Sequence, residues 1–207
     1  MEKIKRKIDF EEIMEMDKRY RATFINSLTG FKSVSLIGTK DKEGNTNLAI
    51  FNSIVHLGAH PPLIGMVVRP DSVDRHTLQN IEETGCYTIN HILPDFIEKA
   101  HQTSARYPME VSEFDAVGLT PEYKGDFNAP FVGESTIQIA MNFKEKVPFT
   151  INNTLFIIGE INQIYLPSDI ILQDGFVDLV AASSITNSGL DSYHSVNKGL
   201  RFPYAKP

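Results

Sequence analysis

The sequence lacks the features that mark disulfide-stapled, membrane-spanning or nucleic-acid-binding proteins. It has one cysteine in 207 residues, which excludes an internal disulfide and a cysteine-rich metal site. No run of about 18 apolar residues occurs, and the N-terminus alternates charged and apolar residues, so neither a membrane span nor a signal peptide is expected. With 20 basic against 26 acidic residues the net charge is −6, which supplies no basic field for nucleic acid. We expect a cytoplasmic protein with no nucleic-acid or membrane partner.

The familiar catalytic and nucleotide-binding motifs are also missing. Neither GxGxxG, a P-loop nor a GxSxG elbow occurs. His56 and His60 are four residues apart, but Gly58 and Pro61 argue against a helix that would align them on a metal. The sequence therefore predicts no catalytic side chain and no metal site.

The composition is that of a packed globular protein. Hydrophobic residues make up 42% and charged residues 22%, and the length suits a single domain spanning residues 1–207. Cys86 follows Gly85 at the start of an apolar segment. It is therefore expected to be a small buried hydrophobe rather than a reactive thiol.

Three helices are expected. The first begins near Asp17 and ends at Gly30, with apolar residues at steps of four; the second covers 74–84, and the third opens at Pro94 and runs to about His101. Strands are expected at 33–39, 46–53, 63–68, 86–92, 136–144 and 154–166. Gly159 is expected to mark a bulge, and 106–133 to be an irregular loop.

This order of elements decides the fold class. The strands are joined mostly by turns, and the helices are too few and too irregularly placed for repeated βαβ units. We predict a mainly β protein with short helices, built as an antiparallel barrel.

Two segments have the residue types of a binding site. In 69–77 a buried strand leads into a helix whose N-terminal N–H groups, with Arg75, Ser72 and Thr77, suit a phosphate. Alternatively, Ser72 or Asp74 caps the helix, and Arg75 pairs with Glu82 or Asp71. In 101–106 a row of polar donors either cradles a ring or ribityl chain or forms a capped loop.

Several short motifs, in order, resemble one known family. They lie at 47–49, 51–53, 61–65, 69–70, 76–81, 84–90 and 112–115, and the whole series resembles the flavin reductase-like, FMN-binding split-barrel family from about Tyr20 onward. The tail at 201–207 is similar to that of flavoredoxin-type members. The chain lacks the compact Asn-Ser-x-Thr-Ser stretch of the shorter two-component reductases. The resemblance therefore favours a permanently bound flavin.

The resemblance implies a Greek-key split β-barrel that forms a homodimer, with FMN in a groove near the subunit interface. The strand carrying Asn47, Ala49, Phe51, Asn52 and Ser53 would lie along the isoalloxazine ring. The turn at Arg75, His76 and Thr77 would hold the phosphate, and the loop at Gln102, Thr103, Ser104 and Ala105 would close over the cofactor. Arg69 and Asn80 complete the implied cofactor-binding set.

The implied function is that of an FMN-binding oxidoreductase. Bound flavin would take a hydride from NAD(P)H, the transient donor, and pass electrons to an acceptor that the sequence does not identify. This chemistry needs no acid or base from a side chain, which agrees with the missing motifs. The alternatives are a non-enzymatic FMN carrier or storage protein, and a flavin-free barrel that binds another ligand.

Overall fold

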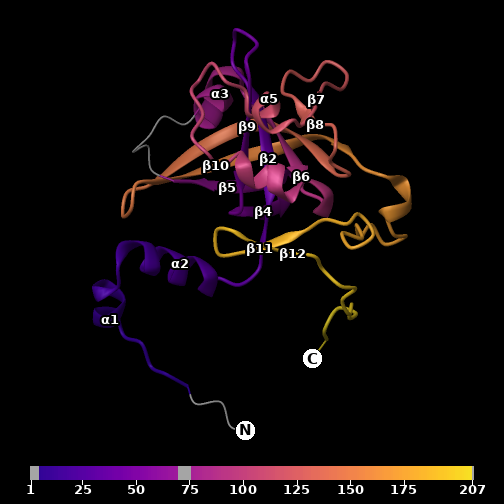
Figure 1. Ribbon diagram of the computed structural model, residues 1–207. Helices are drawn as coiled ribbons and strands as arrows, with labels where there is room; N and C mark the ends of the chain where they lie inside the picture. The colour runs from indigo at the N-terminus through magenta and orange to yellow at the C-terminus, as the bar shows by residue number, and fades with distance from the viewer. Residues whose placement is uncertain (1–4, 70–75, 207) are drawn as a thin grey trace.

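A seven-stranded antiparallel sheet forms the body of the molecule (Figure 1). The computed structural model describes residues 5–69 and 76–206. Along the sheet the strands follow the order β3-β2-β6-β9-β10-β5-β4. Their bounds are Ser35–Lys40 for β2, Thr46–Phe51 for β3, Ile54–Ala59 for β4, Pro62–Val68 for β5, Cys86–His91 for β6, Gln138–Phe149 for β9 and Thr154–Tyr165 for β10.

Smaller elements surround this sheet. The helices are α1 (Phe10–Glu15), α2 (Lys18–Leu28), α3 (His76–Thr84), α4 (Ile97–Gln102) and α5 (Glu113–Val117), with 3-10 turns η1 (Pro94–Phe96) and η2 (Ser168–Ile170). A second sheet joins β1 (Lys32–Ser33), β11 (Thr186–Ser188) and β12 (Ser192–His194), and β7 (Pro121–Glu122) pairs with β8 (Phe131–Val132).

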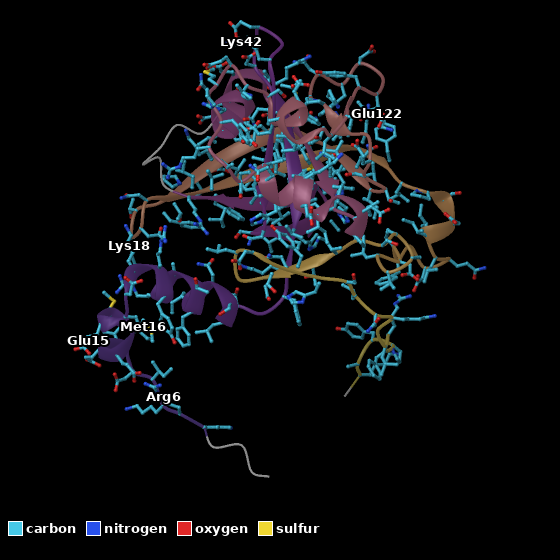
Figure 2. The ribbon with its side chains drawn as sticks, in the orientation of Figure 1. Arg6, Glu15, Met16, Lys18, Lys42 and Glu122 are labelled. Atoms are coloured by element: carbon cyan, nitrogen blue, oxygen red, sulfur yellow. The ribbon has the colours of Figure 1, made fainter. Side chains whose placement is uncertain are left out.

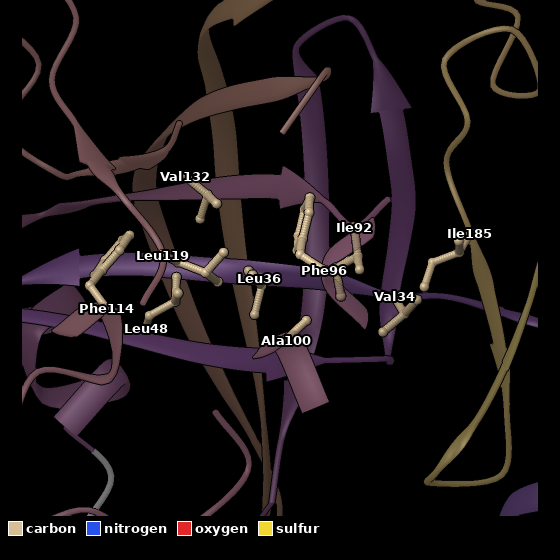
Figure 3. Packing of buried hydrophobic residues seen from close by; sticks show 10 residues of the cluster. All are labelled: Val34, Leu36, Leu48, Ile92, Phe96, Ala100, Phe114, Leu119, Val132 and Ile185. Atoms are coloured by element: carbon tan, nitrogen blue, oxygen red, sulfur yellow. The ribbon is translucent and has the colours of Figure 1, made fainter. Parts of the chain in front are cut away.

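Buried side chains cover both faces of the central strands. On β2, Leu36 packs in one hydrophobic cluster and Ile37 in another, because successive strand residues point to opposite faces. Figure 3 shows the first cluster, with Leu36 near its middle, Phe114 of α5 at one end and Ile185 at the other. The second cluster fills the inside of the barrel and includes Tyr87 of β6. Because both faces of β2 are buried, a shift in its pairing by one residue would exchange the side chains of the two clusters.

The longest strands confirm the strongest sequence prediction. β9 and β10 pair over their full length, and the register shifts between Ile158 and Gly159. A Cβ on Gly159 would overlap the Tyr87 hydroxyl group. The bulge expected at this glycine is therefore confirmed, and the absent side chain also leaves room for the buried tyrosine.

One sequence prediction about the strands needs correction. β4 was not predicted, because it is an edge strand whose exposed Val55, His56 and Leu57 give no alternating pattern. The barrel is split, as the family resemblance implied, since β3 and β4 end the sheet and are not paired with each other in the described parts of the chain. Side chains occupy those edges: Glu113 accepts from the Leu48 N–H, and the Ser33 hydroxyl donates to the Ile54 carbonyl.

The predicted helices largely match the structure. α2 is capped by Asp17, whose carboxylate accepts from the N–H groups of Arg19 and Tyr20. The expected helix at 94–101 begins as the 3-10 turn η1, with Pro94 in its first turn, and continues as α4. The loop at 106–133 contains α5, β7 and β8, which are too short for a periodic signal.

Helices α1 and α2 form an arm (residues 10–28) that stands away from the barrel (Figure 1). Neither helix contains a buried residue. Glu15, Met16 and Lys18, labelled in Figure 2, lie on this arm. Tyr20 is 62% exposed and Leu28 64% exposed, so much of the apolar side of α2 is exposed.

Cys86 is buried at the start of β6, as predicted. Within residues 5–69 and 76–206, no helix has the length and hydropathy needed to cross a membrane. The same described residues contain no group of three or more potential metal-binding side chains.

Candidate ligand-binding groove

A groove of about 1080 Å³ runs along β3 between the start of α3, the loop at 103–109 and the hairpin β11–β12. It exists because β3 is an edge strand: one side pairs with β2, and the other side is left for helices and loops to border. Segments far apart in the sequence thus meet around one hollow.

Most of the residues expected to bind cofactor lie around this groove. Those in its lining are Asn47, Ala49, Phe51, Asn52, Ser53, Arg69, His76, Thr77, Thr103, Ser104 and Ala105. Asn80 and Gln102 lie just outside the lining. Arg75 lies outside the described residues, as do its alternative partner Asp71 and the caps Ser72 and Asp74. The other alternative partner, Glu82, pairs with Lys146.

A buried hydrogen-bond network fixes the end of the groove at α3. The Asn47 amide donates to Thr39 Oγ1 at 3.2 Å and to Thr77 Oγ1 at 2.9 Å. Asn80 also donates to Thr39, at 3.2 Å, and its own Oδ1 has no partner among the described residues. Thr77 Oγ1 accepts from Asn47, and a threonine hydroxyl can also donate one hydrogen bond of its own.

The opposite end of the groove is tied to the C-terminal hairpin. The Asn52 amide donates to Asn187 Oδ1 at 2.9 Å and to the Gly189 carbonyl at 3.1 Å. Asn187 is fully buried and donates in turn to the Ser192 carbonyl. The turn after β3 is therefore held against β11–β12, and the Asn52 nitrogen is already engaged.

The loop beside α4 makes a third border. His101 Nδ1 lies 2.8 Å from the Tyr193 hydroxyl, which joins the end of α4 to β12 across the groove. Gln102 donates to the Tyr107 hydroxyl at 3.0 Å, which explains why Gln102 supports the loop rather than lining the groove. The Thr103 hydroxyl donates to the Ala100 carbonyl and closes the helix.

One buried carboxylate reaches the groove from α5. Glu113 is 6% exposed, and its Oε2 accepts from the Leu48 N–H at 2.9 Å. The neighbouring Ser112 and Thr46 hydroxyls lie 2.7 Å apart, which fixes α5 against β3. Burial raises the pKa of Glu113, while the Leu48 N–H and the charge of His76 act in the opposite direction.

The charges around the groove differ from those of the acidic chain as a whole. Arg69, Arg106 and two histidines face two carboxylates, Glu113 and Asp191. Next to the hairpin, burial lowers the pKa of Lys32, and the Arg69 charge lowers that pKa further. The groove combines apolar walls, polar donors and fixed positive charge, which suits a flat ring with an anionic tail.

Sequence reasoning missed the residues that lie far from the motifs. Asn187, Asp191 and Tyr193 line the groove from the C-terminal hairpin, whose strands have three residues each and give no periodic signal. Glu113 lies within the motif at 112–115. Its sequence signal is its position directly before the apolar Phe114, since a carboxylate next to a core residue is a candidate for a buried, functional acid.

Comparison with known proteins identifies the class. The model of the flavin reductase-like domain matches residues 31–178. The chain belongs to this family. A protein with a split barrel domain from Shewanella frigidimarina NCIMB 400, provisionally named a flavin reductase, is 51% identical, aligns over 97% of this chain and 100% of its own, and has a TM-score of 0.94.

More distant structures share the fold. Flavoredoxin of Desulfovibrio vulgaris (Miyazaki F) is 21% identical over 85% of this chain and 92% of its own, with a TM-score of 0.73. An FMN-binding protein from Thermus thermophilus is 15% identical over 84% of this chain and 90% of its own, with a TM-score of 0.68. The mainly β split-barrel fold predicted from the sequence is confirmed, and the family indicates flavin-related oxidoreductase chemistry.

Proposed function

We propose that the chain binds FMN in the groove along β3 and uses it to transfer reducing equivalents from NADH or NADPH to an acceptor. The observation that carries the proposal is the groove itself, which gathers eleven of the fourteen residues expected at an FMN site. The family and the FMN-binding structural relative support the choice of cofactor.

The size of the groove supports a cofactor together with a second small molecule. Its volume of about 1080 Å³ lies just above the range of roughly 300–1,000 Å³ that is typical of small-molecule pockets. A hydride donor must stack against the cofactor within the same space. We propose that the donor enters between the loop at 103–109 and β12, where Arg106 offers a positive charge to its phosphates.

The residues of this chain would position the cofactor rather than react with it. Thr77 and His76, with Arg75, would hold the phosphate, and the side chains of Ala49 and Phe51 would border the ring. Bound FMN supplies hydride acceptance at its N5. Arg69, which lines the groove, would favour negative charge on the reduced ring.

The proposed assembly is a homodimer. Short helices without tertiary contacts are marginal in water, yet α1 and α2 bury no residue. Val55 and Leu57 of the edge strand β4 are also exposed. A second copy that covers the arm and this strand would bury them and complete the rim of the groove, to which Asn26 of α2 contributes. A single domain over residues 1–207 and a cytoplasmic location belong to the same proposal.

The visible spectrum of the purified protein, followed by titration of the flavin-free protein with FMN, tests cofactor binding. The expected result is a yellow protein, or a colourless one that takes up one FMN per chain. A protein that takes up no flavin would contradict the proposal. A protein that binds FMN tightly but is reduced by neither nicotinamide would be a carrier or storage protein.

A further inference from the structure

We propose that Glu113 binds the hydroxyl groups of the flavin's ribityl chain and so selects ligands that carry a polyol between ring and phosphate. The inference rests on the proposed function, because it assigns a role within the same groove. Its starting point is a carboxylate that is buried everywhere except where it borders the groove.

The place of Glu113 along β3 indicates which part of the cofactor it meets. Asn47, bonded to Thr77, marks the phosphate end, and 49–53 mark the ring end. Leu48, whose N–H is bonded to Glu113, lies between them. In FMN the ribityl chain likewise lies between phosphate and ring. If FMN lies along β3 in this order, the hydroxyl groups of its ribityl chain lie next to Glu113.

The hydrogen-bonding capacity of Glu113 fits that role. An ionised carboxylate accepts at about four positions and donates at none. The Leu48 N–H satisfies one position on Oε2, and polyol hydroxyls are the donors that the remaining positions require. Bonds from hydroxyls to a charged acceptor are among the stronger hydrogen bonds in proteins.

Folding gains little from an acid at this position. Burial disfavours the charged form of Glu113, which is why its pKa is raised, and the backbone N–H groups of Leu48 and Glu113, with the charge of His76, compensate only in part. A neutral glutamine could accept from the same N–H and keep α5 against β3. A buried charge at a place where a neutral amide would keep the same hydrogen bond is more readily explained by a ligand than by packing.

The test measures the affinity of flavin-free protein for FMN, riboflavin and lumiflavin, the last of which has the ring without the ribityl chain. Glu113→Gln is expected to weaken FMN and riboflavin by the same factor, roughly tenfold, and to leave lumiflavin unchanged. Asp115→Asn, an exposed acid on the same helix, is the matched control and should bind all three as the unaltered protein does. The melting temperature of flavin-free Glu113→Gln should be no lower than that of the unaltered protein.

Four results would overturn the inference. If Glu113→Gln weakens the binding of all three flavins equally, Glu113 acts only by holding β3 in position. If it changes none of the three affinities, Glu113 does not contact the ligand. If Glu113→Gln does not fold, the affinities of the unaltered protein for riboflavin and lumiflavin still test the inference. The unaltered protein should bind riboflavin at least tenfold more tightly than lumiflavin, and equal affinities would exclude a ribityl contact. Failure of the unaltered protein to bind any flavin would overturn the proposed function as well.

Discussion

At the scale of single residues, the groove depends on polar side chains that are buried in pairs. Asn47 and Thr77 come from different elements, yet the bond between them is 2.9 Å long and almost fully enclosed. Buried polar groups are expensive to leave without partners. The bond therefore fixes where α3 begins relative to β3, and with it the predicted phosphate end of the groove.

Thr77→Val tests this end of the groove. The valine keeps the shape of threonine but removes the hydroxyl group that bonds Asn47 and that we expect to donate to phosphate. We expect FMN affinity to fall about tenfold and the free energy of unfolding to fall by about 1 kcal/mol. Riboflavin, which has no phosphate, should lose less affinity. Fluorescence titration measures both, and Thr77→Ser, which retains the hydroxyl, should restore binding. FMN binding unaffected by valine would remove Thr77 from the site.

His91 predicts how stability depends on pH. Burial lowers the pKa of His91 to about 4, and its Nδ1 lies 2.9 Å from the Ser184 hydroxyl. In the unfolded chain histidine titrates near pH 6.5, so the unfolded state binds the proton first as the pH falls. The contribution of neutral His91 is thus present above about pH 6.5 and is lost as the pH falls toward 4.

Between pH 7 and pH 5 this linkage should lower the free energy of unfolding by roughly 2 kcal/mol. Urea unfolding at the two pH values, with His91→Gln as the comparison, isolates the effect from that of the carboxyl groups. The variant should show a correspondingly smaller difference between the two pH values. Identical pH dependence in both proteins would show that His91 takes up its proton in the folded state.

At the scale of elements, the sequence predicted those helices and strands that have a clear hydrophobic period and are bounded by capping or turn residues. The alternation in β9, the N-cap of α2 and the bulge at Gly159 all follow from local rules that the structure obeys. Edge strand β4 and the three-residue strands of the hairpin were missed, because tertiary contacts rather than local pattern hold them. Asn187, for example, is fully buried and accepts a hydrogen bond from Asn52, which lies 135 residues away in the sequence.

The arm makes a prediction about assembly. Tyr20→Asp with Leu28→Asp places two charges on the exposed apolar side of α2, where a second copy would have to bury them. We expect this double variant to sediment as a monomer, or as a much weaker dimer, while the barrel remains folded. Lys18→Asp changes an exposed position on the same helix and should leave the dimer intact. A double variant that remains fully dimeric would remove α2 from the interface.

At the scale of the whole molecule, the split in the barrel and the groove have one origin. The sheet ends at β3 rather than closing onto β4, so an edge strand remains where α3, α5, the loop at 103–109 and the C-terminal hairpin can gather. The sequence predicted a barrel, and its motif order indicated which residues meet. The split itself was expected only from the family resemblance, since strand periodicity does not show which edges stay open; in the structure Glu113 accepts a hydrogen bond at the open edge of β3.

Anaerobic mixing of the FMN-loaded protein with NADH and, separately, with NADPH tests the central claim most directly. The claim predicts that at least one of the two nicotinamides bleaches the visible absorbance of the bound flavin within the time of catalytic turnover, and that adding an acceptor restores it. Bound flavin that stays oxidised with both donors would contradict the claim that this groove passes reducing equivalents.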